Sequence, residues 1–112
     1  MISCHNRLAF ERHAAIPGID AIMVRYNASH PGAEHEVFPK LAASRPAVIA
    51  YTATRWGDLI NPALTPEGEP TPRPSDCYRF ALTNRAVDVC MAGPADRGQL
   101  DEALAIDRKS VV

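Results

Sequence analysis

The sequence predicts an α/β fold in which strands and helices alternate and the strands form a parallel sheet. Four short apolar runs, most of them β-branched or bounded by turn residues, are typical of strands, and a helical pattern follows each one. The expected strands are residues 1–3, 19–26, 47–52 and 86–92. Apolar residues are nearly continuous in the second and third runs, which predicts strands covered on both faces.

The first two helices are expected at residues 7–15 and 33–43. The first ends before Pro17 and Gly18, which stop a helix. The second carries an apolar stripe, and Pro39 must either lie near its start or kink it.

The third and fourth helices follow residues that favour helix starts. Ser75 is a natural N-cap for a third helix that runs to Asn84. The fourth helix is expected after Pro94, with Asp101 and Glu102 facing solvent. Its predicted buried stripe is Leu100, Ala103, Leu104 and Ile106.

A long proline-rich loop separates the front and back of the chain. Five of the ten prolines lie between Pro62 and Pro74. Fixed φ angles and missing N–H donors predict no helix or sheet interior at residues 61–74. The four βα units then fit either a small open sheet or half of an eight-stranded barrel, and periodicity does not choose between them.

Composition excludes several classes of protein. The chain of 112 residues is 46% hydrophobic and 22% charged, and its 12 basic and 13 acidic residues give a net charge of −1. This balance disfavours binding to nucleic acid or to an anionic membrane. No apolar run could span a bilayer and no signal peptide is recognisable, so we expect a cytoplasmic protein. The cysteines, Cys4, Cys77 and Cys90, are odd in number and lack a C-x-x-C spacing, which predicts reduced thiols.

Two histidines and two carboxylates lie close together between His30 and Glu36. His30 precedes a Pro-Gly turn and so does not share a helical face with His35, as a zinc motif would require. We therefore expect a solvated helix start and no metal. Cys4 and His5 are adjacent, but neighbours on a strand point to opposite faces, which favours a buried thiol over a catalytic dyad.

Two segments could bind ligands. Residues 93–98 lack the sequence of a P-loop, but a strand-to-helix turn offers free N–H groups to an anion, so a phosphate site and an ordinary turn both stay open. Tyr51 could stack on a planar ligand and Arg55 could meet its anionic group. The alternative for that segment, which also includes Trp56, is a core aromatic with a loop salt bridge.

Four motifs resemble the aldo/keto reductase family in order and spacing. They are Ser3-Cys4-His5-Asn6-Arg7, Val24-Arg25-Tyr26-Asn27, Ala50-Tyr51-Thr52, and Gly93 through Gln99-Leu100. The chain looks like the last four βα units of that family's (β/α)8 barrel, from Ile2 to about Ala105. The resemblance implies a partial reductase domain at residues 1–106 that binds NADP(H) or NAD(H), with carbonyl reduction in the intact parent.

The resemblance also assigns cofactor-binding residues. Ser3 matches the serine that bonds the nicotinamide carboxamide, Tyr51 matches the tyrosine that stacks on the ring, and Thr52 lies near the pyrophosphate. Cys4 and Met23 depart from the usual asparagine and glutamine. Matches at the adenosine end are Gly93, Pro94, Ala95, Gln99 and Glu102, where Arg97 is the one basic residue and leaves NAD versus NADP open.

The family's catalytic tyrosine, aspartate, lysine and histidine belong to the first four βα units, so the resemblance assigns no catalytic residue here. A closed barrel also needs about 200 residues. We therefore expect an inactive, truncated fragment whose exposed barrel edges self-associate. The alternative is a small, non-catalytic nucleotide-binding or scaffold module that self-associates.

The last six residues, 107–112, read as the translation of GAT CGG AAG AGC GTC GTG, the string of a common sequencing adapter. We expect this segment to be a non-native tail. The alternative is an ordinary polar helix end with a basic last turn.

Overall fold

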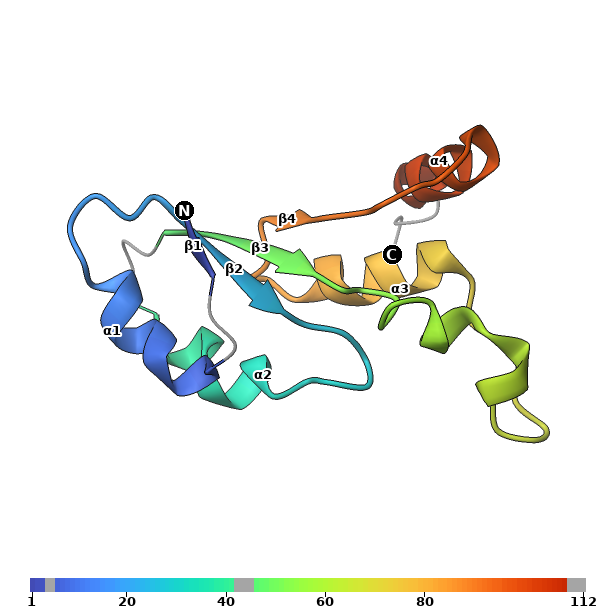
Figure 1. Ribbon diagram of the computed structural model, residues 1–112, viewed down its shortest axis with the longest axis horizontal. Helices are drawn as coiled ribbons and strands as arrows, with labels where there is room; N and C mark the ends of the chain where they lie inside the picture. Colours follow the sequence, from blue (N-terminus) through green and yellow to red (C-terminus); the bar gives the residue numbers. More distant parts are fainter. Residues whose placement is uncertain (4–5, 42–45, 109–112) are drawn as a thin grey trace.

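The computed structural model describes residues 1–3, 6–41 and 46–108, and it has four parallel strands that alternate with helices (Figure 1). The strands are β1 (Ile2–Ser3), β2 (Ala21–Arg25), β3 (Ala47–Tyr51) and β4 (Val89–Cys90). Their order in the sheet is β1-β2-β3-β4, so neighbours in the chain are neighbours in space. The predicted α/β class and parallel sheet are confirmed. A doubly wound sheet reverses its strand order at a switch point, and these four strands run in one sequence.

The α-helices are α1 (Phe10–Ala14), α2 (Ala33–Glu36), α3 (Pro74–Thr83) and α4 (Arg97–Leu104). Short 3₁₀ helices flank three of them: Arg7–Ala9 leads into α1, Phe38–Lys40 follows α2, and Ala105–Arg108 follows α4. The adapter-like tail lies outside the described residues from residue 109 onward.

The second helix is shorter than predicted. It ends at Glu36, because Val37 has a non-helical φ of −123° and ψ of −63°. The chain then turns into the 3₁₀ helix that holds Pro39 near its start, where a proline's missing N–H costs no hydrogen bond. Residues 42–43, also predicted as helical, lie outside the described residues.

The third helix starts two residues earlier than predicted. Ser75 is not its N-cap: the cap is Arg73, whose backbone N–H donates to the Asp76 carboxylate over 2.9 Å, and Pro74 occupies the first helical position. The prediction of no helix at residues 61–74 is also wrong at one turn. Pro62 opens the 3₁₀ helix Pro62–Leu64, which Asn61 caps.

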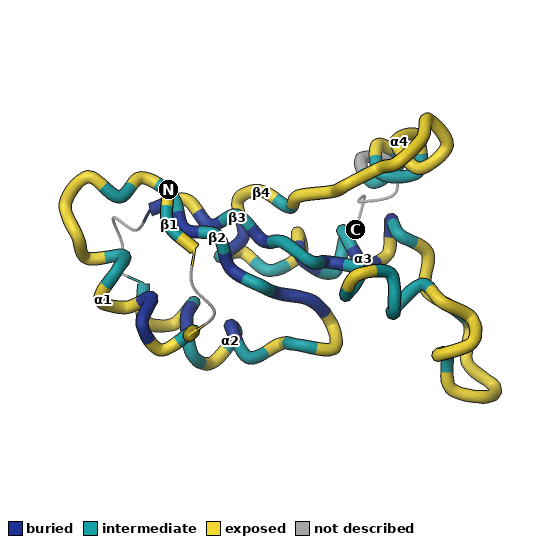
Figure 2. The backbone as a smooth tube through the Cα atoms, in the orientation of Figure 1, coloured by how far each residue is buried: buried dark blue, intermediate teal, exposed yellow. Residues whose placement is uncertain are grey.

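The core packs helices against one face of the sheet, as the dark segments of Figure 2 show. Tyr26 lies near its centre, with its ring 5.2 Å from that of Phe38 and 5.3 Å from that of Phe80. The buried cluster comprises Phe10, Ile22, Val24, Tyr26, Ala33, Val37, Val48, Ala50, Ala81 and Val87.

The opposite face of the sheet is half-exposed. Burial alternates along β2 and β3, although continuous apolar runs predicted burial on both faces. That prediction is wrong for these strands. The pairing of the strands shows which residues lie on this open face: Ser3, Met23, Arg25, Ile49, Tyr51 and Val89. All-parallel sheets are normally covered on both sides, so the open face is unusual for this topology.

The C-terminal arm, residues 91–108, stands apart from the core. Every residue from 91 to 101 is exposed (Figure 2). The predicted buried stripe of α4 is wrong, because no residue of that helix is buried and Leu100 and Leu104 are 44% and 65% exposed. The arm lengthens the molecule, which measures 44 Å along its longest axis and 29 Å along the next.

Candidate functional site

The carboxyl ends of β1, β2 and β3 meet at one edge of the sheet, where α/β proteins bind ligands. Two of the predicted cofactor residues end strands there: Ser3 ends β1 and Tyr51 ends β3, and Thr52 follows directly. Ser3 and Tyr51 lie on the open face, and Tyr51 is half-buried. The structure therefore brings these three predicted residues to the same edge.

Asn27 joins the loops that follow β2 and β3. Its side chain is fully buried, and its amide nitrogen donates to the Thr52 carbonyl over 2.9 Å. Its side-chain oxygen accepts hydrogen bonds from the backbone N–H groups of Ser29 and His30 at 2.9 and 2.8 Å. One amide thus fixes the loop of residues 27–30 against the end of β3.

The loop after β3 adopts an unfavourable backbone conformation. Thr52, Arg55 and Trp56 have φ angles of 58°, 52° and 55°, in the left-handed region that L-residues seldom occupy, and Gly57 follows at 90°. Such residues cost about 1–3 kcal/mol each and cluster at active sites and ligand clamps. Their concentration at this edge supports a functional role for the loop.

His30 lies among aromatic and cationic groups at this edge. Its ring contacts that of Trp56 edge-on, with 6.4 Å between the centroids. Burial lowers the pKa of His30, and the positive charges of Arg25, Arg55 and Arg7 lower it further. Trp56 is 67% exposed, so it is not a core aromatic.

A cavity of about 470 Å³ opens beside this loop. Its polar wall includes Ser29, Arg55, Asp58 and Glu69, and the proline-rich segment supplies much of the rest, including Leu64. Among the described residues Arg55 makes no ion pair, so the salt bridge of the alternative interpretation is not present there.

Both carboxylates between His30 and Glu36 bind side chains of the same chain. Glu34 accepts a hydrogen bond from the Tyr26 hydroxyl, and Glu36 pairs with Arg7. Burial, and then the bond to Glu34, raise the pKa of Tyr26 to about 12. No group of three metal-binding side chains occurs within residues 1–3, 6–41 and 46–108.

The remaining predicted cofactor residues belong to the C-terminal arm. Near the start of α4, the Asp96 carboxylate accepts the Gln99 N–H at 2.8 Å, and the Gln99 side chain accepts the Ala95 N–H at 2.7 Å. Two of the N–H groups offered to an anion are therefore bonded within the chain. Gly93 and Pro94 are exposed.

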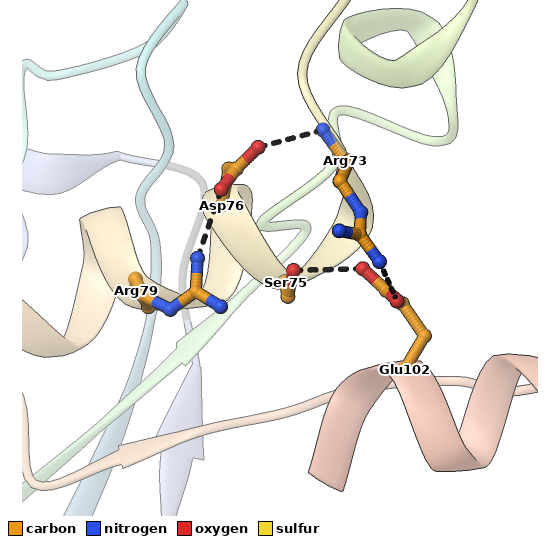
Figure 3. Close-up of polar contacts among 5 residues, drawn as sticks. All are labelled: Arg73, Ser75, Asp76, Arg79 and Glu102. Carbon is orange, nitrogen blue, oxygen red and sulfur yellow. Dashed lines mark hydrogen bonds and ion pairs between the residues drawn. The ribbon is translucent and has the colours of Figure 1, made fainter. Parts of the chain in front are cut away.

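Glu102 joins the arm to α3, although it was predicted to face solvent (Figure 3). Its carboxylate accepts from the Ser75 hydroxyl at 2.7 Å and pairs with Arg73 at 2.8 Å. These bonds, with that from Ser75 the larger contribution, lower the pKa of Glu102. The prediction that Glu102 faces solvent is wrong, because Ser75 and Arg73 at the start of α3 hold it.

Sequence reasoning missed the hydrogen bonds of the Asn27 side chain and those of Glu102. Asn27 could have been found from its position, because an asparagine before a turn often bonds the backbone two residues on. The bonds of Glu102 to Arg73 and Ser75 span 29 and 27 residues, and no local pattern indicates them. Cys77 and Cys90 are free thiols, and Cys4 and His5 lie outside the described residues.

In comparisons with known proteins, no family model, curated protein or solved structure matches the chain. Within the described ranges, no helix is both long and apolar enough to cross a membrane.

Proposed function

We propose that this chain is the nicotinamide-binding part of an NAD(P)H-dependent reductase of the aldo/keto type, built as half of a (β/α)8 barrel. The observation that carries the proposal is the position of Ser3 and Tyr51, which end β1 and β3 on the open face of one parallel sheet, on either side of β2. A barrel turns this face inward, and its ligands bind at the carboxyl ends of the strands.

Strand order and burial support the partial barrel. The four strands follow the chain order of a barrel, and one sheet face packs against helices while the other is half-exposed. In a closed barrel the remaining strands would supply the inner layer of side chains. The same open face and free edges also support the alternative of a self-associating, non-catalytic module, which we keep as the second candidate.

The residues fit the two ends of the cofactor unequally. At the nicotinamide end, Tyr51 offers a half-exposed ring and Ser3 an exposed hydroxyl. At the adenosine end, Gln99 and Glu102 are engaged in bonds to the chain itself, and those bonds would have to break. In the intact parent, bound NAD(P)H would supply a hydride to a carbonyl carbon, and Ser3 and Tyr51 would orient the nicotinamide ring. The resemblance places the proton donor on other strands, so we propose binding without turnover.

Calorimetric titration of the whole chain with NADPH, and separately with NADH, tests this proposal. Base–aromatic stacking is worth about 1–3 kcal/mol, so Tyr51→Ala should weaken binding by about 5- to 150-fold. Tyr51→Phe keeps the ring and should bind as the unaltered chain does. Equal affinity of the Ala and Phe variants, or no heat with either nucleotide, would contradict the proposal. A concentration-dependent dimer without nucleotide binding would favour the second candidate.

A further inference from the structure

Arg55 is a half-buried cation at the carboxyl edge of the sheet, and it makes no ion pair with any residue that the structure describes. Its Nε atom is buried and makes no hydrogen bond, and no ion pair reaches its guanidinium among the described residues. Its left-handed φ holds the backbone in a conformation that a non-glycine residue seldom adopts. A partly desolvated charge without a partner is costly, so an added anion would be stabilising there.

His30 provides a second unpartnered polar atom near the same edge. Its Nδ1 atom is buried without a hydrogen-bond partner, and Asn27 fixes the backbone of its loop. The charges that act on its ring are all positive: Arg25, Arg55 and Arg7. Glu36 pairs with Arg7, whereas Arg25 and Arg55 make no ion pair among the described residues.

The cavity beside Arg55 has room for a small molecule. Its volume is about 470 Å³, and Leu59 and Leu64 give it an apolar wall opposite the polar group of Ser29. Asp58 and Glu69 line the same cavity, so a ligand with anionic groups at both ends would be repelled. The lining therefore suits an anionic head on an apolar body.

We propose that this edge binds the oxyanion group, phosphate or carboxylate, of a small organic molecule beside Arg55 and His30, with the body of the molecule against Leu59 and Leu64. The planar guanidinium presents paired N–H donors that match the two oxygens of such a group. Ser29 adds a hydroxyl at the cavity wall.

The resemblance gives the cofactor's adenosine phosphate to residues 93–95 of the arm, which is a different site. It places the pyrophosphate near Thr52, three residues before Arg55, so the proposed site adjoins that part of the cofactor. The proposed site does not depend on the reductase proposal. Where that proposal also holds, the ligand is the carbonyl substrate, which would then be an anionic carbonyl compound.

The test is an NMR titration of the ¹⁵N-labelled whole chain with inorganic phosphate and, separately, with acetate, at constant ionic strength in sodium chloride. We expect saturable shifts at the amides of Ser29, His30 and Arg55. A bound anion also offsets the nearby positive charge and should raise the pKa of His30. The tighter of the two probes identifies the head group as phosphate or carboxylate.

Matched variants separate this site from general charge attraction. Arg55→Gln should weaken binding at least tenfold, and Arg55→Lys should retain part of it. Arg12→Gln, at an exposed arginine on α1, should leave binding unchanged. His30→Gln is a second probe, expected to weaken binding at least threefold should Arg55→Gln fail to give a folded spectrum.

Two results would overturn the proposal: shifts that grow linearly without saturation, or a folded Arg55 or His30 variant that binds as tightly as the unaltered chain. Tyr51→Ala should abolish nucleotide stacking yet leave phosphate or acetate binding intact, so the two proposals fail separately.

Discussion

The sheet core and the C-terminal arm are held by different forces. In the core, apolar side chains from three helices cover one face of β2 and β3, and residues such as Ile22 and Val24 are fully buried. In the arm, α4 has no buried residue, and the carboxylate of Glu102 ties it to α3. Burial of apolar area stabilises a region as a whole, whereas a polar tie at the surface fixes one contact and is screened by water.

The largest contrast should appear when one apolar side chain is shortened in each region. Ile22→Ala removes buried methyl groups and leaves a cavity, so we expect the free energy of unfolding to fall by about 2–5 kcal/mol. Leu104→Ala, at a side chain that is 65% exposed, should change it by less than about 0.5 kcal/mol. Urea unfolding followed by circular dichroism measures both. Similar losses in the two variants would show that the arm packs more tightly than its exposure indicates.

The next effect concerns the buried amide that orders the carboxyl edge. Asn27→Ala removes three side-chain hydrogen bonds and leaves the Ser29 N–H without its partner, which should cost about 1–3 kcal/mol. The His30 N–H and the Thr52 carbonyl each keep one backbone hydrogen bond, to the Asn27 carbonyl and from the Arg55 N–H. Asn61→Ala removes a similar bond at an exposed turn and should cost at most about 1 kcal/mol. The comparison fails if the two asparagines prove equivalent in chemical denaturation.

A pair of glycines compares the backbone of the two regions. Gly57 has a φ of 90° and Gly93 does not lie in the left-handed region, and a Cβ would meet nothing within 4 Å at either position. Gly57→Ala should therefore cost about 1–2 kcal/mol through the backbone alone. Gly93→Ala should leave stability unchanged or raise it by about 0.4–1 kcal/mol, because it restricts the unfolded chain. A loss at Gly93 equal to that at Gly57, seen in thermal melts, would refute this difference.

The smallest effect on global stability should come from the contacts of Glu102 with Ser75 and Arg73. The strength of these contacts depends on pH. The pKa of Glu102 is lower folded than unfolded, so its contribution is present above the ordinary glutamate pKa of about 4.3 and is lost as pH falls through the lowered value. The backbone chemical shifts of α4 should report release of the arm on acidification while the core stays folded.

Glu102→Gln should show the released arm already at neutral pH and no further step in acid. Asp101→Asn, at the exposed neighbouring position, should behave as the unaltered chain. An arm that keeps its shifts in Glu102→Gln would show that apolar contacts with α3 hold it.

Local sequence determined the elements and their order. The apolar runs, the proline-rich segment and the spacing in residues 74–83 predicted the strands, the long connection and the third helix to within a few residues. Prediction from local sequence failed where contacts with other residues decided the conformation. Val37, two residues before Pro39, has a non-helical conformation and ends α2 early. Ser75 donates a hydrogen bond to Glu102 and does not cap its own helix.

The candidate site divides in the same way. Tyr51 and Arg55 were recognisable because residues at and after the end of a parallel strand come to a known edge of the sheet. Thr52 was assigned only by the resemblance. Asn27, His30 and the cavity could not be assembled beforehand, because their contacts join separate loops.

The sequence by itself determined the α/β class, the strand positions and which residues lie at the carboxyl edge of the sheet, because these follow from periodicity and from the geometry of parallel strands. Only the tertiary structure decided that one sheet face stays open, that α4 is exposed, and that Arg55 lacks an ion pair among the described residues. Burial and charge pairing depend on which distant segments come together in the fold. A local sequence pattern predicts the secondary structure of each segment but not its tertiary contacts.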